Sequence, residues 1–440
     1  MLLQHLFPQN NNNNIHSHHI STSTTPMEWN HCSGPTTKST TTTQNMKNEP
    51  LEEGEDSDQH IRLVPKQVSL PVKIAGIGRY LPPHIVPSST IDILCGKPKG
   101  FTEKTTGIKE RRWANSVQHV LKVRKQKFAK NVEQFLSKEE MNITSSSKQA
   151  QELKEKEVTI SWMGAQAALE ALKNAEMTTD DIDLIVNASG TPQRTIPDTS
   201  CFLHKELGLS ESGKPSLSIH STCLSFMSAF HMCAGLIASG MYQTILIVSA
   251  EISTVGLNFE ENPHAGGLIG DGAAAVVLTR SKPGEKSRLS KYLFSTYSDG
   301  ADYTSIRSGG SEFHPNHVYT PSNYMYFDMN GKKILEFTAS RMIRVMEDYQ
   351  PGLSSGNLEG IDWVVPHQAS YAAFHVMSDV LGWPSEKIVK TLEKFGNTIS
   401  ASIPMALYEG IHDGRIKRGD NVFMIGTGAG LTTGMITFTY

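Results

Sequence analysis

Predicted helices and strands alternate along this chain from residue 158 to residue 440. The helices carry apolar residues three or four positions apart, whereas the strands are short apolar runs bounded by turn residues. This alternation predicts an α/β protein with mostly parallel sheets, although periodicity alone leaves the topology open. The predicted helices span residues 159–175, 199–207, 224–240, 331–349, 370–381 and 399–413, and the predicted strands span residues 70–78, 183–188, 216–220, 244–250, 273–278, 363–365, 421–425 and 435–440.

Two segments depart from this alternation. Residues 1–66 are polar and of low complexity, so we expect a disordered tail, which lowers the hydrophobic content of the 440-residue chain to 38%. Residues 115–156 carry nine Lys and Arg against five Asp and Glu, while the apolar pattern continues on either side. We therefore expect a solvated surface insertion with an amphipathic helix at 120–136; a docking surface for an acidic carrier protein is the alternative.

Composition excludes several classes of function. A net charge of −3 and a pI of about 6.6 do not favour nucleic-acid or membrane binding. No apolar run reaches the roughly 18 residues that span a bilayer. The five cysteines are not arranged in metal-ligand pairs, so neither a disulfide framework nor a metal site is expected. These features predict a reduced, cytoplasmic environment. Import into an organelle stays open because residues 1–48 contain a single acidic residue, although the first arginine comes only at Arg62.

Cys223 is the candidate nucleophile. A predicted strand precedes it and an apolar helix follows it, so the thiol is expected near a helix N-terminus, where the thiolate is favoured. A thiolate attacks thioesters readily. A small buried core residue is the competing interpretation of any single cysteine, and we apply it to Cys201 and Cys233 within their predicted helices.

His367 and Asn397 are candidate partners of this cysteine. His367 follows a buried strand, where α/β folds often place functional groups, and its imidazole could donate a hydrogen bond or accept a proton. Asn397 lies in a Gly-Asn turn and could supply an amide donor to an oxyanion hole. A structural histidine and a turn asparagine are the alternatives. The glycine-rich segment 426–434 lacks the lysine of a P-loop, so close approach to a thioester oxygen fits it better.

Together these segments resemble the 3-oxoacyl-acyl-carrier-protein synthase III family. The resemblance runs from about residue 72 to 440 outside the insertion. The stretches that carry it are Gly76-Ile-Gly-Arg-Tyr-Leu-Pro, Thr106-Gly-Ile-Lys-Glu-Arg-Arg, Gly270-Asp-Gly-Ala, Met329-Asn-Gly, Val365-Pro-His-Gln-Ala, Phe395-Gly-Asn-Thr-Ile-Ser-Ala-Ser-Ile-Pro and Asp413-Gly-Arg-Ile-Lys, together with the final glycine-rich strand pair.

The resemblance implies the thiolase fold, with two similar βα halves in five α-β-α-β-α layers. The halves would span residues 67–286 and 287–440, and the chain would form a homodimer. Cys223, His367 and Asn397 would be catalytic in a Claisen condensation of acyl thioesters from coenzyme A or an acyl-carrier protein, without metal or cofactor. Further substrate- or oxyanion-binding positions would be Gly428, Ala429, Phe226, Ile196 and Phe101.

Departures from the family pattern leave the substrates open. Phe101 and Thr105 stand where the family commonly has a tryptophan and an arginine that clamp coenzyme A. Ala372, Ser378 and Asp379 stand where basic residues would dock the carrier protein. The alternatives are an acyltransferase that passes the acyl group to an alcohol or amine, a thioester hydrolase, and a non-catalytic partner subunit.

Overall fold

The computed structural model describes residues 63–117, 119–120 and 158–440. The predicted tail up to residue 62 and nearly all of the predicted insertion, including the helix expected at 120–136, lie outside the described residues. The first described strand begins at Lys66, so regular structure starts slightly earlier than the tail boundary we expected. Within the described part of the chain, no helix is long and apolar enough to cross a bilayer.

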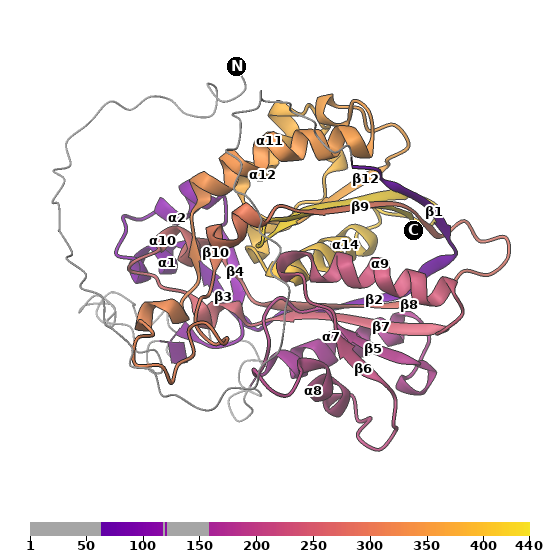
Figure 1. Cartoon of the computed structure of the whole chain (residues 1–440), viewed down its shortest axis with the longest axis horizontal. Helices are drawn as coiled ribbons and strands as arrows, with labels where there is room; N and C mark the ends of the chain where they lie inside the picture. The colour runs from indigo at the N-terminus through magenta and orange to yellow at the C-terminus, as the bar shows by residue number, and fades with distance from the viewer. Residues whose placement is uncertain (1–62, 118, 121–157) are drawn as a thin grey trace, which may run out of the picture. The chain divides into compact units, whose positions relative to one another are not determined.

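Two five-stranded sheets form the framework of the protein (Figure 1). The first has the order β2 (Val72–Tyr80), β8 (Gly272–Arg280), β7 (Thr244–Glu251), β5 (Leu184–Asn187) and β6 (Ser216–Ser218). The second has the order β1 (Lys66–Leu70), β9 (Arg288–Thr296), β14 (Thr432–Thr439), β13 (Asn421–Gly428) and β12 (Trp363–Pro366).

The expectation of mostly parallel sheets is wrong. In the described parts of the two large sheets, three strand pairs are parallel and five are antiparallel. The reason lies in the connections between strands. Parallel neighbours need a crossover helix that returns the chain to the same edge of the sheet. In the described chain, no such helix connects β7 to β8 or β13 to β14, and both pairs are antiparallel.

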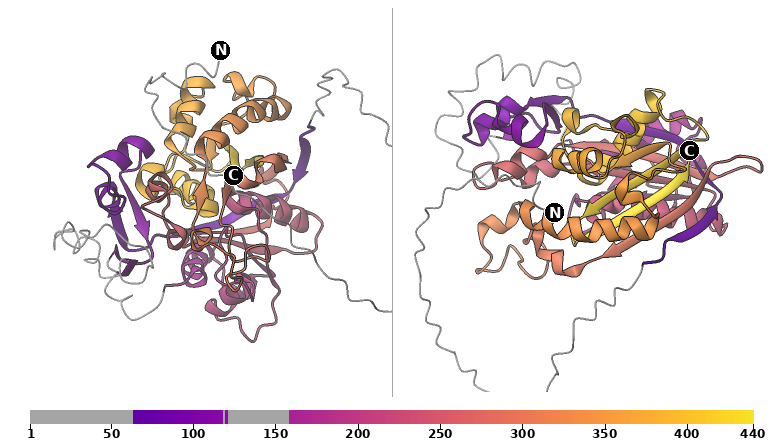
Figure 2. Two further views of the ribbon diagram at one scale, coloured as in Figure 1. Left: turned by 60° about the vertical axis from the view of Figure 1, so that its left-hand side comes forward. Right: turned by 90° about the horizontal axis from the view of Figure 1, so that it is seen from above.

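Helices cover both faces of each sheet and give the five layers that were predicted (Figures 1 and 2). Two central helices, α9 (Ser225–Ala238) and α14 (Ser402–His412), lie between the sheets and contact both. The outer helices are α7 (Ile160–Asn174) and α8 (Thr199–Glu206) beside the first sheet, and α11 (Gly331–Tyr349) and α12 (Tyr371–His375) beside the second.

Smaller elements complete the fold. A two-stranded sheet pairs β3 (His84–Pro87) with β4 (Glu110–Trp113), and another pairs β10 (Thr304–Ser305) with β11 (Asp328–Met329). Short helices lie near them: α1 (Ser88–Leu94), α2 (Phe101–Thr106), α10 (Pro263–Leu268) and α13 (Leu392–Phe395). The sequence patterns did not predict these small elements, because each is too short to show a period.

The central helices are buried because their sequences are apolar on nearly every side. In α9, Phe226, Phe230, Cys233 and Ile237 are all buried in the core between the two sheets. The expectation that Cys233 is a core residue is confirmed, whereas that for Cys201 is wrong: Cys201 lies on the exposed face of α8. The four described cysteines are free thiols.

Candidate active site

Cys223 lies in a 3₁₀ turn, η3 (Thr222–Leu224), immediately before the central helix α9. The turn is fastened by Ser225, whose hydroxyl accepts from the Ser221 N–H at 2.9 Å and donates to the Thr222 carbonyl at 2.7 Å. Thr222 has a φ of +48°, a value that non-glycine residues seldom adopt. The chain is therefore turned sharply at the position that presents Cys223.

The turn between β13 and β14 contacts the cysteine from the second sheet. The backbone N–H groups of Ala429 and of Cys223 itself both act on the thiol and favour its charged form. A side chain at Gly428 would lie 3.2 Å from the Ser221 carbonyl oxygen and 3.6 Å from the Cys223 nitrogen, so glycine permits this approach. An oxyanion hole requires two such donors beside the oxygen of the attacked carbonyl, and that carbonyl would adjoin this sulfur.

The ionisation of Cys223 differs from the sequence prediction. We expected the helix N-terminus to favour the thiolate, but burial and then the nearby Glu251 carboxyl raise the pKa of Cys223 to about 12. Removal from water disfavours a charged sulfur more than the two backbone donors favour it. The resting cysteine is therefore a neutral thiol.

His367 follows β12 and is held as a neutral imidazole. Burial lowers the pKa of His367 to about 4. Its Nδ1 lies 2.6 Å from the Ser402 hydroxyl at the start of α14. If that hydroxyl donates to Nδ1, Nε2 carries the proton and can donate to a substrate oxygen.

The segment after His367 is fixed by a buried glutamine. The side-chain amide of Gln368 donates to the carbonyls of Pro366 and Val389, and its oxygen accepts from the N–H groups of Thr391 and Leu392. Three of these four contacts, those with Val389, Thr391 and Leu392, connect the end of β12 to the segment that leads to Asn397. A satisfied buried amide of this kind holds its neighbours rigidly.

Asn397 is oriented by its own turn. Its Oδ1 accepts from the Ile399 N–H at 2.8 Å, which leaves its Nδ2 as a donor. That Nδ2 lies 3.4 Å from the carbonyl oxygen of Ala369, so Asn397 adjoins the segment that follows His367. Gly396 has a φ of +66°, and a side chain there would strike the Leu268 carbonyl oxygen at 2.7 Å. The Gly-Asn pair is therefore required by the backbone as well as by the amide.

The structure brings these three segments together. The 3₁₀ turn of Cys223 packs against β13 and against the turn η10 (Ile399–Ala401) that follows Asn397. A side chain at Gly426 of β13 would touch both His367 (2.8 Å) and Leu224 (2.9 Å), so this glycine lies between the histidine and the residue that follows Cys223.

Three other predicted positions lie on α9, in the loop before α8 and on α2. Phe226 packs against Phe230 in the core. Ile196 is 83% exposed on the surface. Phe101 lies on α2, where its ring contacts His264. The Thr105 hydroxyl is bound to the carbonyl of Phe101, one turn earlier in its own helix.

Sequence reasoning missed three residues around this site: Ser402, Gln368 and Glu251. Glu251 could have been found, because it is the one charged residue in the apolar run 244–251 and lies at the carboxyl end of a strand. Among the described residues, no group of three or more His, Cys, Asp or Glu side chains could hold a metal ion.

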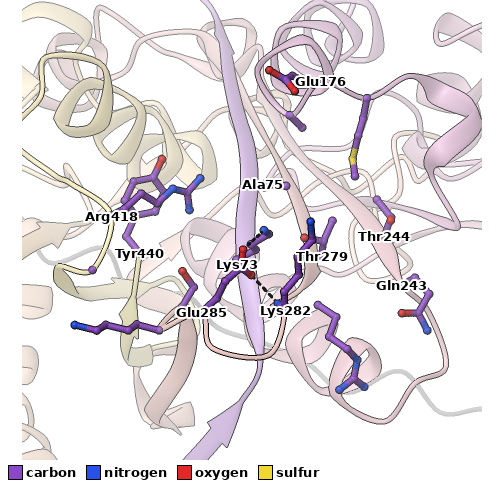
Figure 3. Close-up of a pocket in the computed structure, with 16 residues that line it drawn as sticks. Lys73, Ala75, Glu176, Gln243, Thr244, Thr279, Lys282, Glu285, Arg418 and Tyr440 are labelled. Atoms are coloured by element: carbon purple, nitrogen blue, oxygen red, sulfur yellow. Dashed lines mark hydrogen bonds and ion pairs between the residues drawn. The ribbon is translucent and has the colours of Figure 1, made fainter.

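A separate polar groove of about 1000 Å³ lies at the other end of the first sheet (Figure 3). It is lined by Lys73 of β2, Thr244 of β7 and Arg418, and Lys73 forms an ion pair with Glu285 there. Thr244 begins β7 and Glu251 ends it, so the groove is roughly 23 Å from the cysteine end of that strand. It does not belong to the candidate active site.

The fold and the site define a thiolase-fold protein with a cysteine, a histidine and an asparagine at one location. Comparison with known proteins refines this class. The family model of 3-oxoacyl-[acyl-carrier-protein] synthase III matches residues 217–300, and the model of the C-terminal part of that enzyme matches residues 354–440.

Relatives and solved structures agree with these matches. The chain is 29% identical to beta-ketoacyl-[acyl-carrier-protein] synthase III of Aquifex aeolicus over 370 residues, which cover 84% of this chain and 99% of the relative. It is 33% identical to the synthase III of Clostridium perfringens over 280 residues, covering 62% and 82% of the two chains. The chain belongs to the 3-oxoacyl-acyl-carrier-protein synthase III family of condensing enzymes.

Structural comparison supports the same fold. The crystal structure of the Aquifex aeolicus synthase III matches with a TM-score of 0.65 and 28% identity, covering 84% of this chain and all of that one. A variant of Xanthomonas campestris OleA matches with a TM-score of 0.66 at 19% identity, covering 84% and 99% of the two chains. The thiolase fold predicted from the sequence is confirmed.

Proposed function

We propose that this protein joins two acyl thioesters by a decarboxylative Claisen condensation, with Cys223 as the acyl carrier. The observation that carries the proposal is that the turn at Gly428 and Ala429 packs directly on the backbone of Cys223, where the N–H groups of Ala429 and Cys223 both act on the sulfur. A thioester carbonyl attacked by that sulfur would place its developing negative charge between these donors. The thiol proton would leave with the departing thiol of coenzyme A or a carrier protein.

His367 and Asn397 would act in the second half of the reaction. A malonyl-type thioester would lose carbon dioxide, and Nε2 of His367 and Nδ2 of Asn397 would donate hydrogen bonds to the resulting enolate oxygen. The enolate carbon would attack the acyl-cysteine, form the carbon–carbon bond and release the Cys223 thiolate, which regains a proton. A neutral histidine suits this role, and burial supplies it by lowering the pKa of His367 to about 4.

A second candidate is an acyltransferase that passes the acyl group from Cys223 to an alcohol or amine. The exposed face of α12 and the following π-helical segment (Val376–Val380) favours it, because Asp379 there pairs with His375 instead of presenting a basic patch. An acidic carrier protein would find no attraction at this pair. Release of carbon dioxide from a malonyl thioester distinguishes condensation from transfer.

The proposal includes the partners of this protein. Thioesters of coenzyme A and of a carrier protein would both be acyl donors, and the chain would assemble as a homodimer. The 83% exposure of Ile196 is consistent with its lining the acyl pocket of a second copy of this chain. A cytoplasmic location also stays a prediction.

The test is intact-protein mass spectrometry after incubation with a panel of acyl-coenzyme A and acyl-carrier-protein thioesters. We expect one acyl mass on the wild type and none on Cys223→Ala. Adding malonyl thioester should then discharge the acyl group with release of carbon dioxide. Equal labelling of Cys223→Ala, or no labelling of the wild type, would contradict the proposal.

A further inference from the structure

Glu251 is a buried carboxyl group to which the mechanism above gives no role. It ends β7 and has no solvent exposure. Burying a carboxyl group is costly unless its oxygens receive hydrogen bonds. The contacts that stabilise it therefore indicate which parts of the protein it holds.

Both oxygens of Glu251 accept hydrogen bonds from backbone N–H groups. Oε1 accepts from the Gly190 N–H at 2.5 Å and Oε2 from the Thr191 N–H at 3.1 Å. The Thr191 hydroxyl also donates to Oε2 at 2.6 Å, and the Ser400 hydroxyl donates to Oε1. Because a backbone N–H can only donate, a glutamine at this position would leave one of the two N–H groups facing its NH₂ group.

The Gly190 side of this contact lies directly against the cysteine turn. A side chain at Gly190 would lie 3.1 Å from the Thr222 carbonyl oxygen, so the loop packs on the residue before Cys223. The Gly190 carbonyl oxygen also lies 3.0 Å from Nε2 of His220, three residues before the nucleophile. A shift of this loop would therefore move the backbone that presents Cys223.

The Ser400 side belongs to the turn that carries Asn397. Ser400 lies in η10, beside Ile399, whose N–H fixes the Asn397 side chain and whose φ is +48°. Ser402, two residues later, contacts His367 at 2.6 Å. One carboxyl group thus joins the loop beside Cys223 to the turn that orients Asn397 and leads into Ser402, the partner of His367.

We propose that Glu251 is a positioning residue of the condensing site, which fixes Cys223 relative to Asn397 and His367 by holding the Gly190 loop to the Ser400 turn. The proposal rests on the condensing function proposed above. Glu251 also influences the thiol electrostatically, because its carboxyl group raises the pKa of Cys223. Burial in turn raises the pKa of Glu251 itself. The other titratable groups nearby are His220 and His367.

The test compares Glu251→Gln with a matched control, Asp271→Asn. Asp271 is also a fully buried carboxyl group that accepts from backbone N–H groups, those of Ala114 and Thr254. For each purified full-length variant, we would measure the thermal midpoint of unfolding and kcat and KM for condensation. We would also measure how the rate of Cys223 alkylation by iodoacetamide depends on pH, with intact-protein mass spectrometry as the readout.

For Glu251→Gln we expect kcat to fall by about tenfold or more while KM changes little, because misplaced groups weaken the chemical step. We expect alkylation of Cys223 to shift to lower pH, because a negative charge beside the sulfur is gone. Asp271→Asn should lose thermal stability without this shift. A purely structural role for Glu251 would instead lower kcat only in proportion to the unfolded fraction and leave the alkylation profile of the folded protein unchanged, and this result would overturn the proposal.

Ser400→Ala provides a second test if Glu251→Gln does not fold. It keeps the carboxyl group and removes one hydroxyl that donates to it. We expect kcat to fall about threefold or more, with the Cys223 alkylation profile close to wild type. An unchanged kcat in Ser400→Ala would contradict the proposal. Absence of acylation in the wild type would instead refute the condensing function itself, so the two failures are distinguishable.

Discussion

At the residue scale, burial decides the chemistry of the site more than local sequence does. The sequence placed Cys223 between a strand and a helix, and the structure confirms that position. The pKa of Cys223, however, moves in the opposite direction from the prediction, because it depends on burial and on a carboxyl group that only the fold brings close to the sulfur. Glu251 is 28 residues away in sequence, and no local pattern links it to Cys223.

His367 gives a prediction for the pH dependence of stability. Its pKa is about 4 in the folded protein and about 6.5 when unfolded, so the unfolded chain binds the proton first as the pH falls. Stability that is present above pH 6.5 is therefore lost progressively down to pH 4. We expect about 2 kcal/mol of this loss between pH 7 and pH 5.

Urea unfolding at several pH values checks this prediction. In His367→Gln the wild-type loss between pH 7 and pH 5 should shrink by about that 2 kcal/mol, because the buried ionisable group is gone. Other groups contribute equally to both proteins and cancel in the difference. Parallel stability curves for the two proteins would show that burial leaves the pKa of His367 at its unfolded value.

At the element scale, the contact between β2 and α7 depends on glycine. A side chain at Gly78 of β2 would lie 2.3 Å from the Ala167 carbonyl oxygen and 2.4 Å from the Ala171 nitrogen. These are backbone atoms of α7, so the helix would have to move as a unit. We expect Gly78→Ala to lower the free energy of unfolding by about 3 kcal/mol, measured by urea denaturation.

Gly235→Ala is the control for that substitution. Gly235 lies inside α9, and a side chain there would meet no atom within 4 Å. Alanine favours a helix over glycine by up to about 1 kcal/mol, so this variant should be as stable as wild type or more stable. A Gly78→Ala variant as stable as wild type would mean that helix–strand packing at Gly78 tolerates an added methyl group.

Sequence patterns predicted the long elements well. The helix expected at 331–349 is α11 with the same bounds, and the strand expected at 244–250 is β7 with one further residue. The helix expected at 370–381 is instead divided into α12 and a π-helical segment, a change in hydrogen bonding that side-chain periodicity does not report. The prediction of mostly parallel sheets failed for a related reason. Whether two strands run parallel depends on which distant segments pair, and side-chain periodicity does not report that pairing.

At the scale of the whole molecule, the two sheets are joined by the central helices, and polar contacts fasten α14 to the first sheet. Tyr408 of α14 donates its hydroxyl to Glu170 of α7 at 2.8 Å, and the other Glu170 oxygen accepts from the N–H of Arg79 in β2 at 2.6 Å. Arg79 in turn lies over the Tyr408 ring at 4.7 Å and forms an ion pair with Glu409. These contacts join residues 79, 170 and 408 into one cluster.

This cluster predicts how the described part of the chain unfolds. Since α14 packs on β2 and β8 of the first sheet and on β12 of the second, neither sheet keeps its core when the other opens. Tyr408→Phe removes one hydrogen bond to a carboxylate, which contributes about 1.5–3 kcal/mol to stability. We expect the urea midpoint to fall while the transition stays single and its slope unchanged, as followed by both circular dichroism and tryptophan fluorescence. Two separated transitions in Tyr408→Phe would show that the sheets are stabilised independently, and that the shared helices couple them less strongly than their burial indicates.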